Sequence, residues 1–391
     1  MPSEPNPVEH LRRLLAARAP RRPERAGLES VATGSPAPAD VLARVEETMK
    51  RMPPDEIVDP QEFRRALETL YRAAEPAIGR LQADPAAAFT PHETMALEAV
   101  IRTDGSRPAL LLRDGLPPEN HPLAGSWATQ LAAQRDTIRA VATATGRIEP
   151  EQASGQNFFG TGWLVDAAKG IVLTNLHVVQ AFMRRPTTLA KADNGKIRVF
   201  DGVYIDFVAE TRTETRNRYR VVQAEPAGID GDGFARLDIA ALKIEPAAES
   251  QAIGRAIEVV ADPDGPRGNL SSVCVIGYPG PPPRTAGVAE GVDWGWVNAT
   301  LFGGRYGLKR IAPGTVHKQL GFSADDPKRW IFGHDATTLG GCSGSAIVAW
   351  LDGGGAFGIH FAGTSVESNF AHAFAKCVEA LKRIGVPVVE P

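Results

Sequence analysis

Residues Gly340-Gly341-Cys342-Ser343-Gly344-Ser345-Ala346 place a serine inside a glycine-rich turn, and this segment is the most informative part of the chain. Only glycine lets a backbone turn sharply and point its amides inward without steric cost. Such N–H groups can stabilise the negative charge that develops on a carbonyl oxygen during acyl transfer. We therefore expect Ser343 to be a nucleophile and the N–H groups of Gly341 and Ser343 to form an oxyanion hole.

Two earlier segments supply the partners that a serine nucleophile needs. Such a serine requires a base to take its proton and a carboxylate to hold that base in the correct tautomer. Residues 174–179 read Thr-Asn-Leu-His-Val-Val, and residues 237–243 read Leu-Asp-Ile-Ala-Ala-Leu-Lys. His177 is the predicted base and Asp238 the predicted carboxylate. With Ser343 they form a predicted catalytic triad.

These three segments, in the order His, Asp, Ser, resemble the chymotrypsin-like serine proteases. The first is similar to the family's T-A-x-H-V pattern, the second to D-I-A-L-L-K and the third to G-x-S-G-G/S-P. The resemblance covers roughly residues 155–385. It implies a mainly β fold, a chymotrypsin-like double six-stranded antiparallel barrel. It also implies a serine endopeptidase that hydrolyses a protein or peptide substrate.

Within the family, the chain is most similar to the bacterial glutamyl endopeptidases and the high-temperature-requirement proteases. Residues 277–280 (Gly-Tyr-Pro-Gly), Thr337-Thr338 and residues 358–361 (Gly-Ile-His-Phe) carry this likeness. It implies that Thr337 forms the base of the substrate pocket and that Thr338 and His360 hold a substrate carboxylate. A histidine can donate a charge-assisted hydrogen bond to such a group. We expect an acidic or small polar side chain before the cut, and poor cleavage after basic residues.

Two positions depart from the family pattern. Cys342 stands where the family usually has Asp, Asn or Ser, and Ala346 replaces the usual Pro. In vertebrate digestive members that Asp pairs with a newly cut N-terminus, an ion pair that Cys342 cannot form. Nothing near residues 158–160 resembles the cut site, so we expect no activation by such a cleavage. We interpret Cys342 as a packed small residue rather than a redox switch.

Other residues compete for the roles in the triad. Asp230 and Asp232 lie in a Gly-rich loop, where they are typical of solvated turns, whereas Asp238 opens an apolar run that would anchor a buried carboxylate. Ser345 is the rival of Ser343, but the family spacing favours Ser343. The alternative function is a catalytically inactive protease fold that serves as a binding or scaffold module. The intact triad argues against it, because a decayed copy usually loses one member.

The remaining ionisable residues indicate no metal or cofactor. There is no H-E-x-x-H and no C-x-x-C in the sequence, so we predict no metal site and no cofactor. A net charge of −3 gives no electrostatic reason to expect a nucleic-acid partner. His334 and Asp335 precede the nucleophile loop and are expected to build it. Five other histidines show no ligand-like spacing: His10, His92, His121, His317 and His372.

The sequence changes character near residue 145. Before it, segments rich in Ala, Arg, Leu and Glu have helical spacing, and after residue 155 short apolar or alternating runs are separated by turn residues. We therefore divide the chain into a helical N-terminal region, residues 1–145, and a trypsin-like protease domain with a C-terminal helix, residues 146–391. Residues 19–38, rich in Arg, Pro, Gly and Ser, indicate a linker or a disordered segment.

The periodicity predicts individual elements. Asp59-Pro60 would open one helix, as an N-cap followed by Pro at the first helical position. Helices are predicted around 11–15 and over 41–52, 63–81, 93–101, 127–145 and 375–384. Strands are predicted over 109–112, 162–165, 171–174, 197–200, 219–223, 239–244, 273–278, 294–300, 346–351 and 357–361.

The N-terminal region is the candidate for control of activity. The chain has no run of 18 apolar residues, no apolar signal-peptide stretch, and three widely spaced cysteines rather than a paired framework. We therefore expect a cytoplasmic protein without membrane contact. A protease kept there without a zymogen cut needs another restraint, so residues 1–145 would pack on the protease or bind a regulatory protein partner. Residues 107–112 could add a strand to a barrel or bind near the cleft.

Overall fold

The computed structural model describes residues 14–15, 37–83, 89–228, 233–262, 272–281, 288–289, 291–351, 353–364 and 368–390. The predicted linker lies almost wholly outside these residues, as do Asp230 and Asp232 and most of the helix predicted around residues 11–15. Of that helix, Leu14 and Leu15 are described and are helical and buried. None of the helices in the described ranges is both long and apolar enough to cross a membrane.

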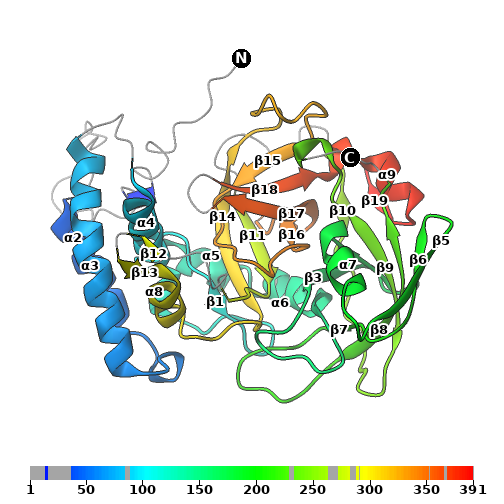
Figure 1. The fold of residues 1–391 in the computed structure, drawn as a ribbon, viewed down its shortest axis with the longest axis horizontal. Coiled ribbons are helices and arrows are strands. Elements are labelled where there is room, and N and C mark those ends of the chain that lie inside the picture. The colour runs from blue at the N-terminus through cyan, green and yellow to red at the C-terminus, as the bar shows by residue number, and fades with distance from the viewer. Residues whose placement is uncertain are drawn as a thin grey trace.

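The first barrel is a closed ring of six antiparallel strands in the order β8-β7-β2-β3-β4-β9, completed by pairing of β9 with β8 (Figure 1). A hairpin extends β8 outside the ring. A helix, α7 (Leu176–Met183), follows β4 directly. The strands of the ring are β2 (Thr145–Glu149), β3 (Gly160–Asp166), β4 (Ile171–Thr174), β7 (Tyr204–Asp206), β8 (Arg218–Pro226) and β9 (Ala240–Pro246). The hairpin consists of β5 (Leu189–Asp193) and β6 (Lys196–Asp201).

The second barrel is also a closed antiparallel ring, in the order β16-β11-β14-β15-β18-β17, completed by pairing of β16 with β17. This confirms the predicted double barrel. The strands are β11 (Ser272–Gly277), β14 (Arg310–Lys318), β15 (Ile331–His334), β16 (Ala346–Val348), β17 (Ala356–Thr364) and β18 (Ser368–Ala373). Outside the ring, β10 (Val259–Val260) pairs in parallel with both β17 and β19 (Val388–Val389). The predicted C-terminal helix is present as η4 (Phe374–Lys376) and α9 (Val378–Arg383).

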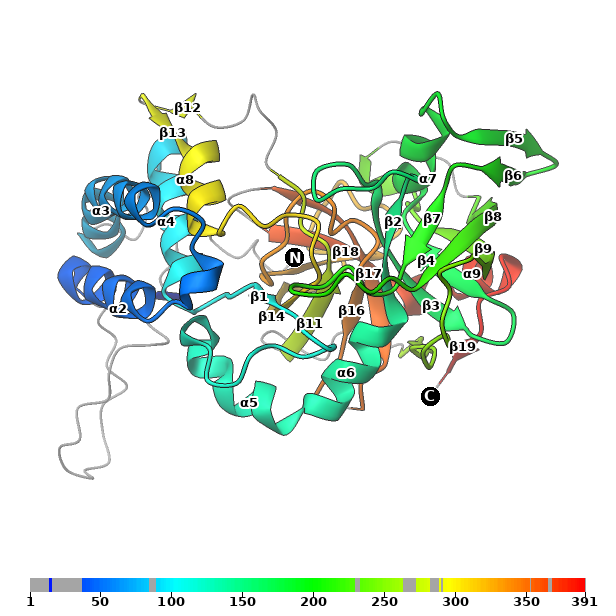
Figure 2. The same ribbon diagram turned by 90° about the horizontal axis from the view of Figure 1, so that it is seen from below.

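The N-terminal helices form a separate layer beside the barrels (Figure 1). They are α2 (Pro38–Lys50), α3 (Pro60–Ala83) and α4 (Pro91–Thr103), with a short turn η1 (Pro54–Glu56) before α3. Asp59 caps α3 as predicted, because its carboxylate accepts the N–H groups of Gln61 (2.7 Å) and Glu62 (3.1 Å). The helix predicted over 127–145 is instead a series of shorter helices that runs toward the first barrel (Figure 2). The series comprises η2 (Pro122–Trp127), α5 (Ala128–Ala133) and α6 (Arg135–Ala144).

The strand predicted over 294–300 is wrong, because these residues form the helix α8 (Trp294–Leu301). The side chain of Asp293 caps it by accepting the N–H of Trp296 at 2.9 Å. Trp294, Val297 and Leu301 then fall on one face and are buried in the core of the N-terminal helices. A segment between β11 and β14 thus completes the helical layer (Figure 2). It also carries a small hairpin of β12 (Val288–Ala289) and β13 (Val292–Asp293).

A strand from the N-terminal region joins the second barrel. β1 (Leu110–Leu111) pairs antiparallel with β14, with Leu110 opposite Ile311 and Leu111 opposite Arg310. This confirms the strand predicted over 109–112. The helical layer and the second barrel are therefore joined twice. The segment between β11 and β14 contributes α8 to the helical layer, and the N-terminal region contributes β1 to the sheet of the second barrel.

Candidate active site

His177 and Asp238 are held together by two hydrogen bonds. His177 is the second residue of α7, and its Nδ1 lies 2.5 Å from Oδ2 of Asp238. The backbone N–H of His177 donates to Oδ1 of the same carboxylate at 2.9 Å. Asp238 is itself anchored through its carbonyl, which accepts the side-chain amide of Asn175 at 2.8 Å. The predicted base and carboxylate thus meet, with the imidazole still 40% exposed toward the surface.

The surroundings of Asp238 favour its ionised form. Burial of the carboxyl group opposes ionisation. The hydrogen bonds from the side chain and backbone of His177 outweigh that effect and hold the pKa of Asp238 below its ordinary value. A carboxylate at this position keeps the proton of His177 on Nδ1, which leaves Nε2 free to act as a base.

The loop around Ser343 depends on two glycines with left-handed backbone angles. Gly341 has φ +93°, and a Cβ there would lie 2.6 Å from the carbonyl oxygen of Tyr278. Gly344 has φ +90°, and a Cβ there would lie 2.1 Å from the carbonyl oxygen of Thr161. Only glycine fits both the angles and the space. Thr161 also holds the loop, because its hydroxyl donates to the carbonyl of Gly341 (2.8 Å) and its N–H to that of Ser343 (2.9 Å).

Gly160 brings the serine loop beside the helix that carries His177. A Cβ on Gly160 would lie 2.7 Å from Cγ2 of Val178 and 3.1 Å from the carbonyl oxygen of Ser343. In the described part of the chain, no hydrogen bond joins the hydroxyl of Ser343 to the imidazole of His177. Catalytic hydrogen bonds are often long in a free enzyme and tighten only when substrate binds.

The backbone N–H groups of Gly341 and Ser343 are the candidates for the oxyanion hole. Neither has a hydrogen-bond partner among the residues that the structure describes. The N–H groups of Cys342 and Gly344, by contrast, donate to the carbonyls of Leu339 (3.0 Å) and His360 (2.9 Å). Two free donors next to the proposed nucleophile are what an oxyanion hole requires.

The predicted pocket residues differ in what they can offer a substrate. The hydroxyl of Thr337 already donates to the carbonyl of Arg107 at 2.6 Å, and Thr338 is half-buried. His360 is buried and its Nδ1 lies 3.3 Å from Nε2 of His334. Burial, together with the charges of His334 and His177, lowers the pKa of His360 well below its ordinary value. The neutral form of His360 is therefore favoured in the substrate-free pocket.

The residues before Ser343 build the loop. Asp335 accepts the N–H of Thr315 at 2.6 Å and its hydroxyl at 2.8 Å, and also binds Arg107. Cys342 is buried, and burial raises the pKa of its thiol to about 12. A buried, protonated thiol is typical of a packing residue rather than a reactive one.

Sequence reasoning missed one histidine of this site. His372 lies on β18, and its Nε2 accepts the backbone N–H of Asp238 at 3.2 Å. No local signal marks it, because the two residues are 134 positions apart and belong to different barrels. Among the described residues, no three His, Cys, Asp or Glu side chains gather as metal ligands would.

Comparison with known proteins gives three likenesses. The profile of the trypsin-like peptidase domain matches residues 160–359. A Lysobacter enzymogenes protein described as a probable serine protease is 38% identical over 386 residues, which cover 97% of this chain and 98% of that protein. The solved structure of the Vibrio cholerae VesB protease matches 62% of this chain and 64% of its own, with 15% identity and a TM-score of 0.42.

Proposed function

We propose, because the chain belongs to the trypsin-like serine peptidases, that it is an endopeptidase in which Ser343, His177 and Asp238 form the catalytic triad. The observation that carries this proposal is the double hydrogen bond between His177 and Asp238. One bond orients the imidazole, and the other fixes the carboxylate relative to the start of α7. This is the arrangement that a general base needs.

In the proposed mechanism, Nε2 of His177 takes the proton of the Ser343 hydroxyl while Oγ attacks the carbonyl carbon of the scissile peptide. The N–H groups of Gly341 and Ser343 donate to the oxyanion of the tetrahedral intermediate. The proton on Nε2 then passes to the leaving amine, which leaves an acyl group on Ser343. Water hydrolyses that ester by the same steps, with His177 again taking and returning the proton.

We propose that the pocket accepts acidic or small polar side chains. Thr337 carries no charge, so nothing at that position would attract Lys or Arg. If Nε2–H of His334 donates to Nδ1 of His360, the proton of His360 lies on Nε2, and a substrate oxygen would compete for it with the backbone of Phe370. A neutral donor discriminates less strongly than a charged one, so the preference should be moderate.

We propose an intracellular setting for this activity. The three cysteines, Cys274, Cys342 and Cys377, are all buried free thiols, which fits a reducing compartment. Cell fractionation with an antibody against the chain tests this proposal. Recovery of the protein outside the cytoplasm would contradict it.

The N-terminal region is proposed to support the loop that carries Ser343. The guanidinium of Arg107 binds both carboxylate oxygens of Asp335, at 2.6 and 2.7 Å, and the carbonyl of Arg107 accepts the hydroxyl of Thr337. The guanidinium of Arg310 donates to the carbonyl of Ala109 at 2.7 Å. Through these contacts the N-terminal region touches the loop that carries Ser343, so it can affect activity with or without a regulatory partner.

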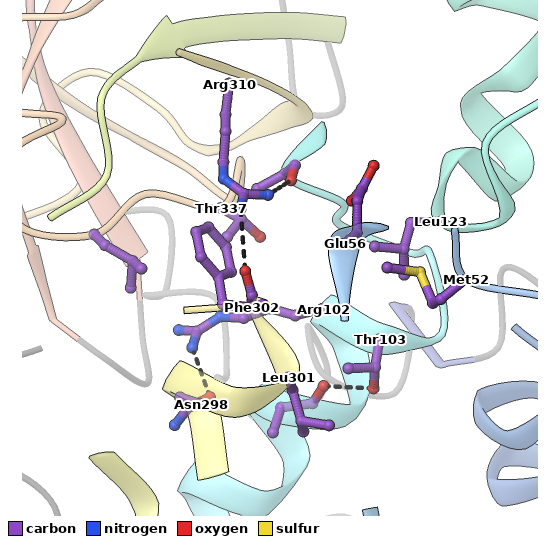
Figure 3. A pocket seen from close by; sticks show the side chains of 14 residues that line it. Met52, Glu56, Arg102, Thr103, Leu123, Asn298, Leu301, Phe302, Arg310 and Thr337 are labelled. Atoms are coloured by element: carbon purple, nitrogen blue, oxygen red, sulfur yellow. Dashed lines mark hydrogen bonds between the residues drawn. The ribbon is translucent and has the colours of Figure 1, made fainter. Parts of the chain in front are cut away.

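A cavity of about 40 Å³ lies where the helical layer meets this loop (Figure 3). Arg102 of α4 donates to Asn298 of α8 at 3.2 Å on one side of it, and Arg310 and Thr337 come from the barrel side. The cavity wall therefore includes both the N-terminal helices and the base of the proposed substrate pocket. A change in the packing of the helices would therefore alter the surroundings of Thr337.

Reaction with a fluorophosphonate probe tests the central proposal. The wild-type chain should label at one site, identified as Ser343 by mass spectrometry, and should cleave a peptide library. The inactive binding module is the alternative. Absence of labelling, together with absence of cleavage, would favour that alternative and overturn the triad.

A further inference from the structure

We infer that His372 is a positioning residue for Asp238, and that it sets the carboxylate of Asp238 against His177 by holding the Asp238 backbone. The inference rests on the proposed function, since it concerns the same triad. His372 makes no hydrogen bond to His177 or Ser343 in the described part of the chain, so it would act only through Asp238.

The hydrogen bond crosses between the two barrels. Asp238 lies just before β9 of the first barrel, whereas His372 lies on β18 of the second. The N–H of Asp238 donates to Nε2 of His372 at 3.2 Å, and both groups are buried. Asp238 is therefore held at three points: by Asn175 through its carbonyl, by His177 through its carboxylate, and by His372 through its N–H.

The imidazole of His372 is locked in place by aromatic rings. It stacks on Phe361 with the ring centroids 4.2 Å apart and the planes 16° apart. The ring of Trp330 meets it edge-on, with centroids 5.7 Å apart. Trp330 is fixed in turn, because its indole N–H donates to the carbonyl of Phe234 at 2.8 Å. The acceptor atom offered to Asp238 is thus rigid, as a positioning contact requires.

His372 buries a polar atom without a hydrogen-bond partner in the described part of the chain, a free-energy cost that a residue used only for packing would avoid. Its Nε2 can accept a hydrogen bond only if the imidazole is neutral with its proton on Nδ1. That Nδ1 is buried and has no hydrogen-bond partner among the described residues. An apolar side chain would fill the same space without an unsatisfied donor. The hydrogen bond to Asp238 is the feature of His372 that such a side chain could not reproduce.

Three variants separate positioning from packing. His372→Phe keeps an aromatic ring on Phe361 but removes the acceptor, while His372→Gln restores an acceptor near the position of Nε2. His317→Phe is the matched control, because His317 is also a buried histidine of the second barrel, bonded to Ser368 at 2.8 Å. Each kcat is divided by the number of folded sites, counted by end-point fluorophosphonate labelling.

We expect kcat of His372→Phe to fall roughly tenfold to a hundredfold with KM within about twofold, since small displacements of a catalytic group cost this much. His372→Gln should recover most of the loss, and His317→Phe should leave kcat unchanged even if it lowers stability. Equal kcat in wild type and His372→Phe, or equal loss in the Gln and Phe variants, overturns the inference. If His372→Phe does not fold, His372→Met replaces it with the same expectation.

The failure of the proposed function has a different signature. In that case the wild-type chain itself neither labels nor cleaves. The contact is then tested by amide hydrogen exchange at Asp238, which should be faster in the Phe variant than in wild type and in the Gln variant. Unchanged exchange would show that His372 does not hold this N–H.

Discussion

One carboxylate accepts both the backbone and the side chain of a single histidine: Oδ1 of Asp238 lies 2.9 Å from the backbone nitrogen of His177, and Oδ2 lies 2.5 Å from its Nδ1. The backbone contact fixes the carboxylate against the start of α7, and the side-chain contact then orients the imidazole. Because burial of Asp238 opposes ionisation while these bonds favour it, the pair is also sensitive to the loss of either bond.

Asp238→Asn should reduce kcat by about 10⁴ at neutral pH with little change in KM. An amide that donates to Nδ1 would force the proton of His177 onto Nε2 and remove the base. The control is Asp166→Asn, because Asp166 lies near the surface and caps a turn at Lys169. Steady-state kinetics on one peptide substrate compare the variants. A loss of less than tenfold would show that Asp238 is not the triad carboxylate.

Ser343→Ala should lower kcat by about 10⁶, the scale seen when a triad serine is removed. Ser345→Ala should retain activity, although its stability will change because Ser345 is fully buried. Both variants are compared by peptide cleavage and by thermal unfolding. The assignment of the nucleophile is wrong if activity survives in the first variant and disappears in the second.

Cleavage of a peptide library, read by mass spectrometry, should show acidic or small polar residues before the cut. Thr337 carries no charge and His360 is neutral, so neither can attract a cation by charge. His360→Leu should weaken any acidic preference and leave small polar substrates largely unaffected. A strong preference for Arg, or for large aromatic residues, would be incompatible with this pocket.

Arg107→Ala should lower kcat/KM by about tenfold or more, because the bidentate contact with Asp335 and the carbonyl contact with Thr337 brace the loop before Ser343. Asp335→Asn should have a similar effect, and the double variant should lose less than the sum of the two. Arg80→Ala is the control, since Arg80 pairs with Glu93 within the helical layer. Equal activity of the Arg107 and Arg80 variants would refute the bracing role.

Stability should rise with pH through the contribution of Lys309. Burial of Lys309 lowers its pKa to about 8, although Glu210 opposes the shift. Between that value and the ordinary pKa of 10.5, the unfolded chain binds a proton that the folded chain has lost, so unfolding becomes less favourable as pH rises. The Lys309→Met variant lacks the titrating amine and therefore lacks this pH-dependent contribution to stability. Urea unfolding near pH 7 and near pH 10 gives the free energy of unfolding of both proteins. The wild-type value minus the variant value should be larger near pH 10, and a difference that does not change with pH would contradict the assignment.

Local patterns were sufficient for the elements whose burial is periodic. Amphipathic spacing predicts α2, α3 and α4, and the Asp59-Pro60 pair correctly predicts how α3 begins. Alternating or apolar runs predict most strands of the first barrel. The helix over 127–145 is broken because Gln134, between α5 and α6, leaves helical geometry with ψ +24°. Glutamine is common inside helices, so the sequence at this position does not predict the break.

Other elements have no distinct local pattern. β14 contains Pro313 and Gly314, which normally argue against a strand, and β18 contains Asn369 and His372. Barrel closure supplies the partners that make them strands: β14 pairs with β11 and β15, and β18 with β15 and β17. Residues 294–300 read as a strand because a short apolar run is ambiguous, and their helix is selected by burial against α3 and α4.

The family and the double barrel could be inferred from short segments, because those segments resemble the motifs of a known family. The same segments supply His177, Asp238 and Ser343 as candidates for the triad that acyl transfer needs. The hold of His372 on Asp238, the brace of Arg107 on Asp335 and the neutral state of His360 depend on folding. Each joins residues that are far apart in the chain or arises from burial. Such contacts are created when the barrels close and the helical layer packs on them, so no local segment of the sequence contains them.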